Sequence, residues 1–221
     1  MTKEARPRYD LCGGHPALDF VNSLDDRFGA DGPSELLADY ADLLRFTEQT
    51  RLLDARQVRR LGSAVDPGAA ARALRSAREL REAMAAAFYG GVDQRAPLAA
   101  DIRTLERYFH AASGHRELRW EQALEKSQRR SGLAWDWGRF ETHAELPVWV
   151  LSRSASELMM SEAMDRIRAC GAETCRWLFL DTSKNHTRRW CNMKVCGNRM
   201  KARRFQARRE PSDSAHSKTP E

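Results

Sequence analysis

Apolar residues recur at helical spacing over much of the N-terminal part of the chain. The clearest stripe consists of five residues at intervals of three or four positions: Ala73, Ala77, Leu80, Met84 and Ala87. Such spacing places side chains on one face of an α-helix. Asp66 and Pro67 supply a start, because Asp caps the first free N–H groups and Pro is tolerated in the first turn. The pattern predicts a long helix from Asp66 to the glycine pair at Gly90.

Shorter stretches with the same period predict further helices. One helix is expected to begin at Ser34, and three more are expected at about 55–61, 98–112 and about 145–160. Within 98–112, three apolar residues recur at spacings of three and four, so we expect them to face the core: Ile102, Leu105 and Phe109.

Three short segments favour strands instead. Leu18–Asn22 follows a glycine pair and the turn His15–Pro16, and it is expected to form an opening strand. Leu118–Trp120 and Leu133–Trp137 flank a polar stretch, which is typical of two strands joined by a turn. Together the elements predict a mainly α fold with a small antiparallel β element (α+β) in an N-terminal domain of residues 1–162.

Composition places the chain among globular proteins. It has 221 residues, enough for one or two domains, with 42% apolar and 31% charged residues. Its apolar runs are far shorter than the roughly 18 residues of a membrane span, so no membrane association is expected. The start MTKEARPRYD lacks an apolar secretory segment. We therefore expect a cytoplasmic location, where thiols stay reduced and clustered cysteines favour metal binding.

Positive charge is concentrated in the last quarter of the chain. Residues 166–221 hold 14 Lys and Arg against 5 Asp and Glu, whereas residues 1–165 hold 23 against 26. A basic module on a slightly acidic body indicates an anionic partner for that module. The final stretch, 211–221, is polar and is predicted to be a disordered tail.

Four of the five cysteines lie close together in this basic quarter. Their spacing, Cys170-x4-Cys175-x15-Cys191-x4-Cys196, forms two close pairs, which is a zinc-site layout. Four thiolates satisfy tetrahedral Zn²⁺ and leave no position for water, so the residues predict one structural ion rather than a catalytic one. The alternative is four free thiols. Cys12 stands alone and is expected to be a core or loop residue.

The segment between the two cysteine pairs predicts a β-hairpin. Trp177–Leu180 is expected to form a strand, Asp181–Asn185 a turn and Arg188–Trp190 the returning strand. His186 falls in the turn and is interpreted as a surface residue rather than a ligand. So small a unit needs the metal in order to fold.

Several motifs in this segment resemble the signature of the bacterial CGNR zinc finger: WLFLD (177–181), SKN (183–185), RRWC (188–191) and CGNR (196–199). The glycine pair 13–14 and the motif LDFVN (18–22) resemble the opening of the ABATE domain, which commonly precedes this finger. That family is described as candidate stress-induced transcription regulators. The resemblance implies a zinc-dependent DNA-binding finger over residues 163–210, joined to an N-terminal domain that senses a signal or dimerises.

The end of the finger predicts a basic helix. Gly197 is expected to supply a positive φ after the last ligand, and Asn198 to cap a helix that runs to about Arg209. Met200 and Phe205 are expected to pack this helix onto the hairpin.

We expect this basic module to contact double-stranded DNA. One helix face would read base edges, because Arg pairs with guanine and Gln with adenine; it holds Arg199, Arg203 and Gln206. The other face and the hairpin would meet phosphates and fix the register. The residues expected there, together with Asn198 at the helix start, are Lys184, Arg188, Arg189, Lys201, Arg204 and Arg208.

Three alternatives stay open at this stage. The helix could have non-specific affinity only, the finger could bind RNA, or the chain could be a ligand-binding protein or an enzyme with a structural zinc appendage. No nucleotide loop or defensible catalytic triad is visible, so no enzyme is predicted. Asp19 and Asn22 either line a pocket for a small-molecule effector or hydrogen-bond neighbouring loops, and the second is favoured. The sequence leaves a homodimer open.

Overall fold

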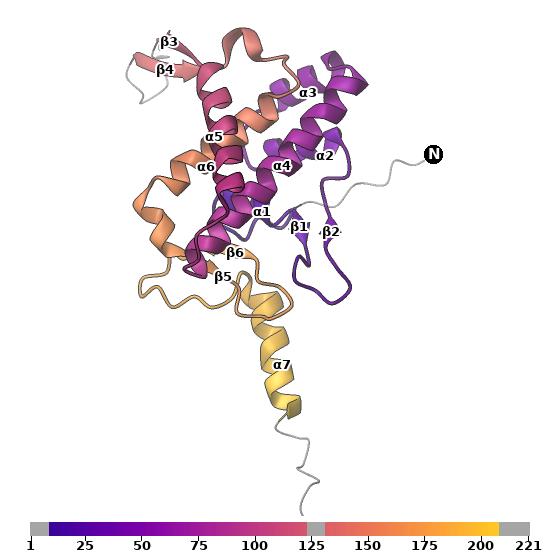
Figure 1. Cartoon of the computed structure of the whole chain (residues 1–221), viewed down its shortest axis with the longest axis vertical. Coiled ribbons are helices and arrows are strands. Elements are labelled where there is room, and N and C mark those ends of the chain that lie inside the picture. Colours follow the sequence, from indigo (N-terminus) through magenta and orange to yellow (C-terminus); the bar gives the residue numbers. More distant parts are fainter. Residues whose placement is uncertain (1–8, 123–130, 208–221) are drawn as a thin grey trace, which may run out of the picture.

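Helices dominate the structure. The computed structural model describes residues 9–122 and 131–207 (Figure 1). Its α-helices are α1 (Pro16–Val21), α2 (Tyr40–Gln49), α3 (Ala55–Ala64), α4 (Pro67–Val92), α5 (Ala99–Gly114), α6 (Leu146–Met159) and α7 (Asn198–Ala207). Short turns of other pitch are η1 (Gly138–Phe140), η2 (Glu162–Arg166) and η3 (Met193–Gly197).

The strands form small antiparallel pairs. These are β1 (Leu24–Asp25) with β2 (Ser34–Glu35), β3 (Glu117–Glu121) with β4 (Gly132–Asp136), and β5 (Ile167–Ala169) with β6 (Leu178–Leu180). The predicted mainly α fold with small antiparallel β elements is confirmed. None of the helices in the described part of the chain combines the length and apolar character that a bilayer crossing requires.

Local capping explains where several helices start. The Asp66 carboxylate accepts from the backbone N–H groups of Gly68 and Ala69 at the start of α4. Asp54 and Gln57 cap α3 reciprocally. The predicted stripe of α4 does face the core, but the helix continues beyond Gly90. The chain folds back over that residue, and an added Cβ there would lie 2.5 Å from the Arg95 carbonyl oxygen, so Gly90 permits close packing rather than ending the helix.

Two N-terminal predictions were wrong. Leu18–Val21 belongs to α1 rather than to a strand, and Asn22 is its C-cap, because His15 accepts from the Ala17 N–H and Pro16 opens the helix. Every residue from Ala17 to Val21 is buried, and a short, fully buried run has no period that separates helix from strand. Ser34 lies in β2, and the helix expected there starts at Tyr40, where Asp39 forms a capping box.

The inward face of α5 also differs from the prediction. Ile102 is 52% exposed, whereas Leu105 and Tyr108 point to the core and Phe109 is half-buried. Tyr108 also donates to Glu79 of α4 through its hydroxyl group, 2.7 Å away. That hydrogen bond fixes the rotation of α5 against α4, which no apolar pattern within α5 reveals.

The main core extends from the helices into the C-terminal segment. Side chains of α1, α2, α4, α5 and α6 form one buried cluster. Ile167 of β5 and Leu178 of β6 are fully part of that cluster. The hairpin β5–β6, which lies beside α1 and α4 in Figure 1, is therefore packed into the helical body.

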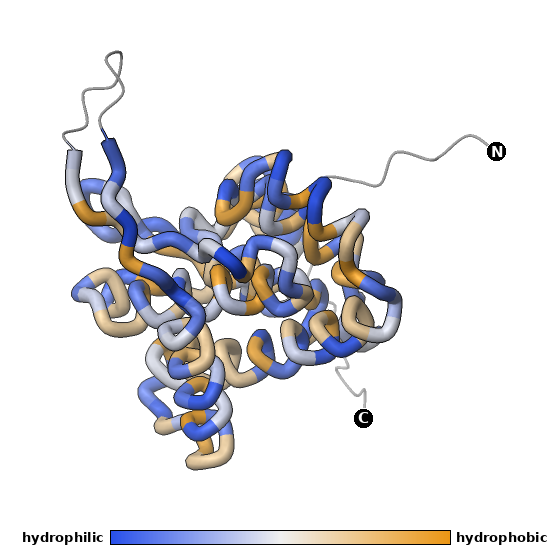
Figure 2. Tube along the Cα trace, turned by 90° about the horizontal axis from the view of Figure 1, so that it is seen from above, coloured by the Kyte–Doolittle hydropathy of each residue, from blue (hydrophilic) through white to orange (hydrophobic). Residues whose placement is uncertain are grey.

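A second hairpin, β3–β4, projects from the body, as the tube in Figure 2 shows. It confirms the two strands expected at 118–120 and 133–137, with Leu118 opposite Trp135 and Trp120 opposite Leu133. These four side chains share one face and are each more than half exposed. The polar turn expected between the strands lies largely outside the described residues, as does the tail 211–221.

Candidate metal centre and basic helix

The hairpin β5–β6 carries the first cysteine pair. Cys170 directly follows β5, and its backbone N–H donates to the Trp177 carbonyl oxygen at 2.9 Å. The partner of β6 is thus β5, and the returning strand expected at Arg188–Trp190 was wrong. That stretch is irregular and meets the hairpin through the Gly171 N–H, which donates to the Arg189 carbonyl oxygen at 2.9 Å.

The four predicted ligands converge. The Sγ atoms of Cys170, Cys175, Cys191 and Cys196 all lie within 4.8 Å of one another. The Cys175–Cys191 and Cys191–Cys196 sulfur distances are 3.6 and 3.7 Å. A tetrahedral site with Zn–S bonds of about 2.3 Å requires sulfur–sulfur distances of about 3.8 Å. The cluster therefore fits one structural zinc ion, held by four sulfurs with no open position.

Backbone groups support the charge that such a site accumulates. Hydrogen bonds with Cys175 and Cys191, together with backbone N–H groups of Cys191 and Ala172, lower the pKa of Cys170. Metal binding displaces protons from the ligand thiols, because zinc binds the thiolate form. His186 lies outside the cluster, with Nδ1 3.3 Å from the Asp181 carbonyl oxygen, in line with its interpretation as a non-ligand.

Two local predictions near the last ligand were wrong. Gly197 does not have a positive φ. An added Cβ there would lie 2.4 Å from Met193 Sδ and 3.3 Å from Trp190 Cδ1, so any larger residue would displace the Met193 side chain. Asn198 is not an N-cap. It continues the turn η3 into α7 and donates to the Lys194 carbonyl oxygen at 3.0 Å, while Asn192 caps the whole unit by accepting from the Lys194 N–H.

Arg188 lies inside the module rather than on its surface. Its guanidinium donates to the carbonyl oxygens of Trp190 (3.0 Å), Cys12 (2.9 Å) and Cys191, and it stacks on the Phe179 ring at 4.3 Å. These contacts join three chain segments around the cysteines. The group predicted to clamp a phosphate is thus directed at backbone carbonyls, and we leave Arg188 out of the interface considered below.

The helix α7 presents most of the remaining basic residues to solvent. It stands away from the body in Figure 1, and its exposed polar residues are Asn198, Arg199, Lys201, Arg203 and Gln206. Arg189 and Lys184 are also exposed. Met200 packs against the cysteine cluster as predicted, whereas Phe205 is 60% exposed, so the packing role predicted for Phe205 was wrong.

Two of the predicted basic contacts cannot be located. Arg204 lies within α7, with its side chain outside the described set, and Arg208 lies beyond residue 207.

Asp19 and Asn22 are buried and bound to backbone groups. The Asn22 amide donates to the Leu178 carbonyl oxygen and accepts from the Leu178 N–H, both at 2.9 Å. Asp19 accepts from the Gly13 N–H at 2.7 Å, and burial raises the pKa of Asp19 to about 7. The geometry favours the hydrogen-bonding alternative over the ligand pocket: Asn22 joins α1 to β6 of the metal centre.

Sequence reasoning missed the contacts between the body and the first cysteine pair. Trp177 Nε1 donates to Asp25 at 2.8 Å, Tyr89 donates to the Arg176 carbonyl oxygen at 3.0 Å, and Arg176 pairs with Asp93 at 2.9 Å. Arg176 follows Cys175 with a φ of 49°. A non-glycine residue in that conformation is strained, and these contacts hold it in place. They join positions more than 80 residues apart, so no local pattern reveals them.

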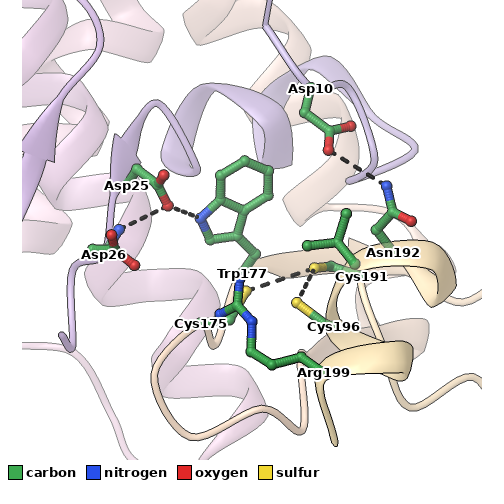
Figure 3. Close-up of a pocket in the computed structure, with 10 residues that line it drawn as sticks. Asp10, Asp25, Asp26, Cys175, Trp177, Cys191, Asn192, Cys196 and Arg199 are labelled. Atoms are coloured by element: carbon green, nitrogen blue, oxygen red, sulfur yellow. Dashed lines mark hydrogen bonds between the residues drawn. The ribbon is translucent and has the colours of Figure 1, made fainter. Parts of the chain in front are cut away.

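A cavity of 180 Å³ opens beside the cysteines (Figure 3). Carboxylates of the body, Trp177, three ligand cysteines and Arg199 of α7 line it. In Figure 3 the Asp25 carboxylate meets the indole N–H of Trp177, while the Cys191 and Cys196 sulfurs lie below it.

Family comparisons agree with this architecture. Residues 166–209 match the CGNR zinc finger, and residues 14–162 match the ABATE family, whose description reads "Putative stress-induced transcription regulator". Comparison with the curated proteins gives no match. The ABATE match alone covers more than half of the chain. The chain therefore belongs to the ABATE family and carries a CGNR zinc finger at its C-terminal end.

Proposed function

We propose that the protein is a zinc-dependent transcription regulator whose helix α7 binds double-stranded DNA. One observation carries the proposal: an exposed basic helix begins two residues after the last ligand, Cys196, and stands clear of the body. Cys196 lies in the turn η3 that leads into this helix, and Met200 of the helix packs against the cysteines. A helix presented in this way can enter the major groove, which admits an α-helix.

The two kinds of contact are divided over the module. Arg199, Arg203 and Gln206 recur at spacings of four and three and share one face of α7, which suits base edges. Exposed Lys184, Arg189 and Lys201 suit phosphates. Asn198, Arg204 and Arg208 stay in the proposed contact set on sequence alone.

Selection of preferred duplexes by the zinc-loaded full chain, followed by fluorescence anisotropy, tests the proposal. Arg199→Ala with Arg203→Ala should lower affinity for the preferred site more than for random DNA, whereas Lys184→Ala should weaken both alike. Arg59→Ala is the matched control, since Arg59 is an exposed arginine on α3 at the far end of the molecule. Uniform losses in all variants would show that α7 reads no bases. Absence of DNA binding at low salt would contradict the proposal itself.

RNA binding and an enzymatic role are the competing functions. The family description points to a regulator, and α7 offers a rod of positive charge rather than a row of stacking aromatics. Single-stranded RNA as a competitor in the same assay separates the two nucleic acids.

For the body, we propose association of two copies through the apolar face of β3–β4. Its four side chains, Leu118, Trp120, Leu133 and Trp135, carry no charge, whereas Arg119 and Asp136 on the opposite face form an ion pair at 2.9 Å. These side chains offer on the order of 500 Å² per copy, so two copies bury about 1,000 Å², the lower bound of a specific interface. A second identical face supplies the apolar complement.

Light scattering after gel filtration tests this association. Trp120→Glu should convert a dimer into a monomer, whereas Arg119→Glu on the opposite face should not. A wild-type protein that is monomeric at high concentration would contradict this part of the proposal.

We propose that a small-molecule effector binds in the cavity of about 600 Å³ between the loop at Phe28 and the end of α4. Tyr89 and Asp93 line it, and both bind Arg176 next to the ligand Cys175. A ligand there would act on the zinc centre through Arg176. Fragment hits found by nuclear magnetic resonance should disappear in Ala86→Trp, which fills the cavity. Hits that persist in this variant would place the effector elsewhere.

A further inference from the structure

The zinc centre has a fifth thiol beside its four ligands. Cys12 packs against the buried cluster of Cys170, Cys191 and Cys196, and its backbone carbonyl oxygen shares one hydrogen-bond donor with that of Cys191. It lies 179 positions before Cys191 in the sequence. Nothing in the zinc site requires it, because four sulfurs already complete the tetrahedron.

The backbone holds Cys12 in this position. One nitrogen of the Arg188 guanidinium, Nη2, donates to the carbonyl oxygens of both Cys12 and Cys191. The next residue, Gly13, accepts from the Leu180 N–H at 2.8 Å and donates to Asp19 at 2.7 Å. Cys12 is thereby fixed between the end of β6 and the second cysteine pair. The shared donor brings the Cys12 and Cys191 backbones together, and a disulfide between them requires Cα atoms about 4.4–6.8 Å apart.

Small solutes can reach this group of sulfurs. The 180 Å³ cavity of Figure 3 is lined by Cys175, Cys191 and Cys196. Cys12 and Cys175 are half-buried rather than enclosed. A peroxide molecule is small enough for such an opening, whereas a protein reductant or oxidase is not.

We propose that Cys12 is an oxidation site that forms a disulfide with Cys191 in the presence of a peroxide. The Cys12 sulfur attacks one peroxide oxygen, the O–O bond breaks, and the leaving hydroxide takes the thiol proton, which gives a sulfenic acid and water. The Cys191 sulfur then attacks the Cys12 sulfur, the S–S bond forms, and hydroxide leaves and takes a proton from solvent as a second water. The two sulfurs lose two electrons, which reduce the peroxide.

The disulfide removes Cys191 from the ligand set. Three sulfurs remain for the metal, and the segment that carries η3 stays attached to it through Cys196 alone. Since α7 continues η3, its orientation changes as well. A consequence for DNA affinity rests on the proposed function, whereas disulfide formation and zinc release do not.

The experiment treats the zinc-loaded full chain with hydrogen peroxide. Zinc release is followed with a colorimetric chelator, and non-reducing peptide mapping identifies the linked cysteines. We expect a Cys12–Cys191 peptide, stoichiometric zinc release and reversal by a dithiol. Cys12→Ser should bind one zinc ion per chain and release it on the order of tenfold more slowly, because the neighbouring thiol is missing.

A matched control restores the number of thiols without restoring their proximity. Ser34→Cys in the Cys12→Ser background places a thiol on the exposed strand β2, and this variant should behave like Cys12→Ser. If Cys12 substitutions fail to fold, differential alkylation of the wild-type protein decides, since Cys12 should lose its reactivity as zinc is released.

Several outcomes would overturn the proposal. These are a disulfide confined to the four ligands, zinc release at an unchanged rate in Cys12→Ser, or zinc binding below one ion per chain in that variant, which would make Cys12 a ligand. Because zinc release and peptide mapping involve no nucleic acid, a protein that never binds DNA would leave this result intact.

Discussion

Replacement of Asn22 tests whether the zinc centre and the helical body fold together. Asn22 is 3% exposed, and its side-chain amide pairs with both the N–H and the C=O group of Leu178, 156 positions away. Leu178 lies in β6, three residues after the ligand Cys175, and belongs to the main core. Asn22→Ala leaves one buried N–H and one buried C=O without their partner.

The expected cost follows from those two groups. Each buried polar group that loses its partner costs about 1–3 kcal/mol, so the variant should lose roughly 3 kcal/mol of unfolding free energy. For a chain of this size, that corresponds to a fall in Tm of about 6–12 °C. The loss should appear in both the helical body and the zinc centre, because the hydrogen bonds join them.

The assay is urea unfolding of the zinc-loaded protein, followed by circular dichroism for the helices and by zinc release for the metal centre. The matched control is Asn185→Ala, an exposed asparagine in the loop after β6, which should change stability by less than about 0.5 kcal/mol. The reasoning is supported if circular dichroism and zinc release report the same transition, with a free energy of unfolding roughly 3 kcal/mol below that of wild type. An Asn22→Ala protein as stable as the control, or two well-separated transitions in wild type, would refute it.

Three further predictions concern charge and metal. Arg81→Met should lower the free energy of unfolding, measured in urea, by about 1–3 kcal/mol, because Glu35 loses two hydrogen bonds of 2.7 and 2.6 Å from the buried guanidinium but keeps its pair with Arg78. Arg107→Met, which breaks an exposed pair, should lower it by less than about 1 kcal/mol. Burial raises the pKa of Asp19 from 3.8 to about 7, so the folded state holds the proton more tightly and stability should fall as pH rises from about 4 to 7. Asp19→Asn should remove that slope, measured as urea midpoints at pH 5 and pH 8. Chelation of zinc should lower the Tm of the helical body measured by calorimetry, and an unchanged Tm would show that the hairpin β5–β6 stays in place without metal.

The sequence predicted the features that depend on neighbouring residues. The α4 stripe, its start at Asp66 and the four ligand cysteines are patterns within a few turns or one short loop. Features set by distant residues were predicted poorly. In the sequence Arg188 resembles a surface cation, because the Cys12 carbonyl oxygen to which it donates lies far away along the chain. The pairing of β6 with β5 is accompanied by a hydrogen bond from the Cys170 N–H to the Trp177 carbonyl oxygen, which no local pattern predicts.

The division between residues 1–162 and 163–210 illustrates the same limit. It follows a change in charge and composition, and it also separates the two family matches. The hydrophobic core crosses this boundary, because Ile167 and Leu178 are buried among α1, α4 and α6. A fragment that starts at residue 166 would expose both residues and leave the Leu178 backbone without Asn22, so DNA binding is better tested on the full chain.

This packing makes zinc binding and body stability reciprocal. If zinc stabilises the position of β6, and β6 completes the core, then any event that loosens the core must weaken zinc binding by the same free energy. Tyr89 and Asp93 contact the Cys175–Arg176 turn, and Asn22 contacts β6, so the body acts on the first cysteine pair. The second pair, Cys191 and Cys196, carries α7. If the body receives a signal, as proposed above, the ion that both pairs share connects it to the basic helix. A variant that removes the Asn22 hydrogen bonds should lower zinc affinity even though it changes no ligand.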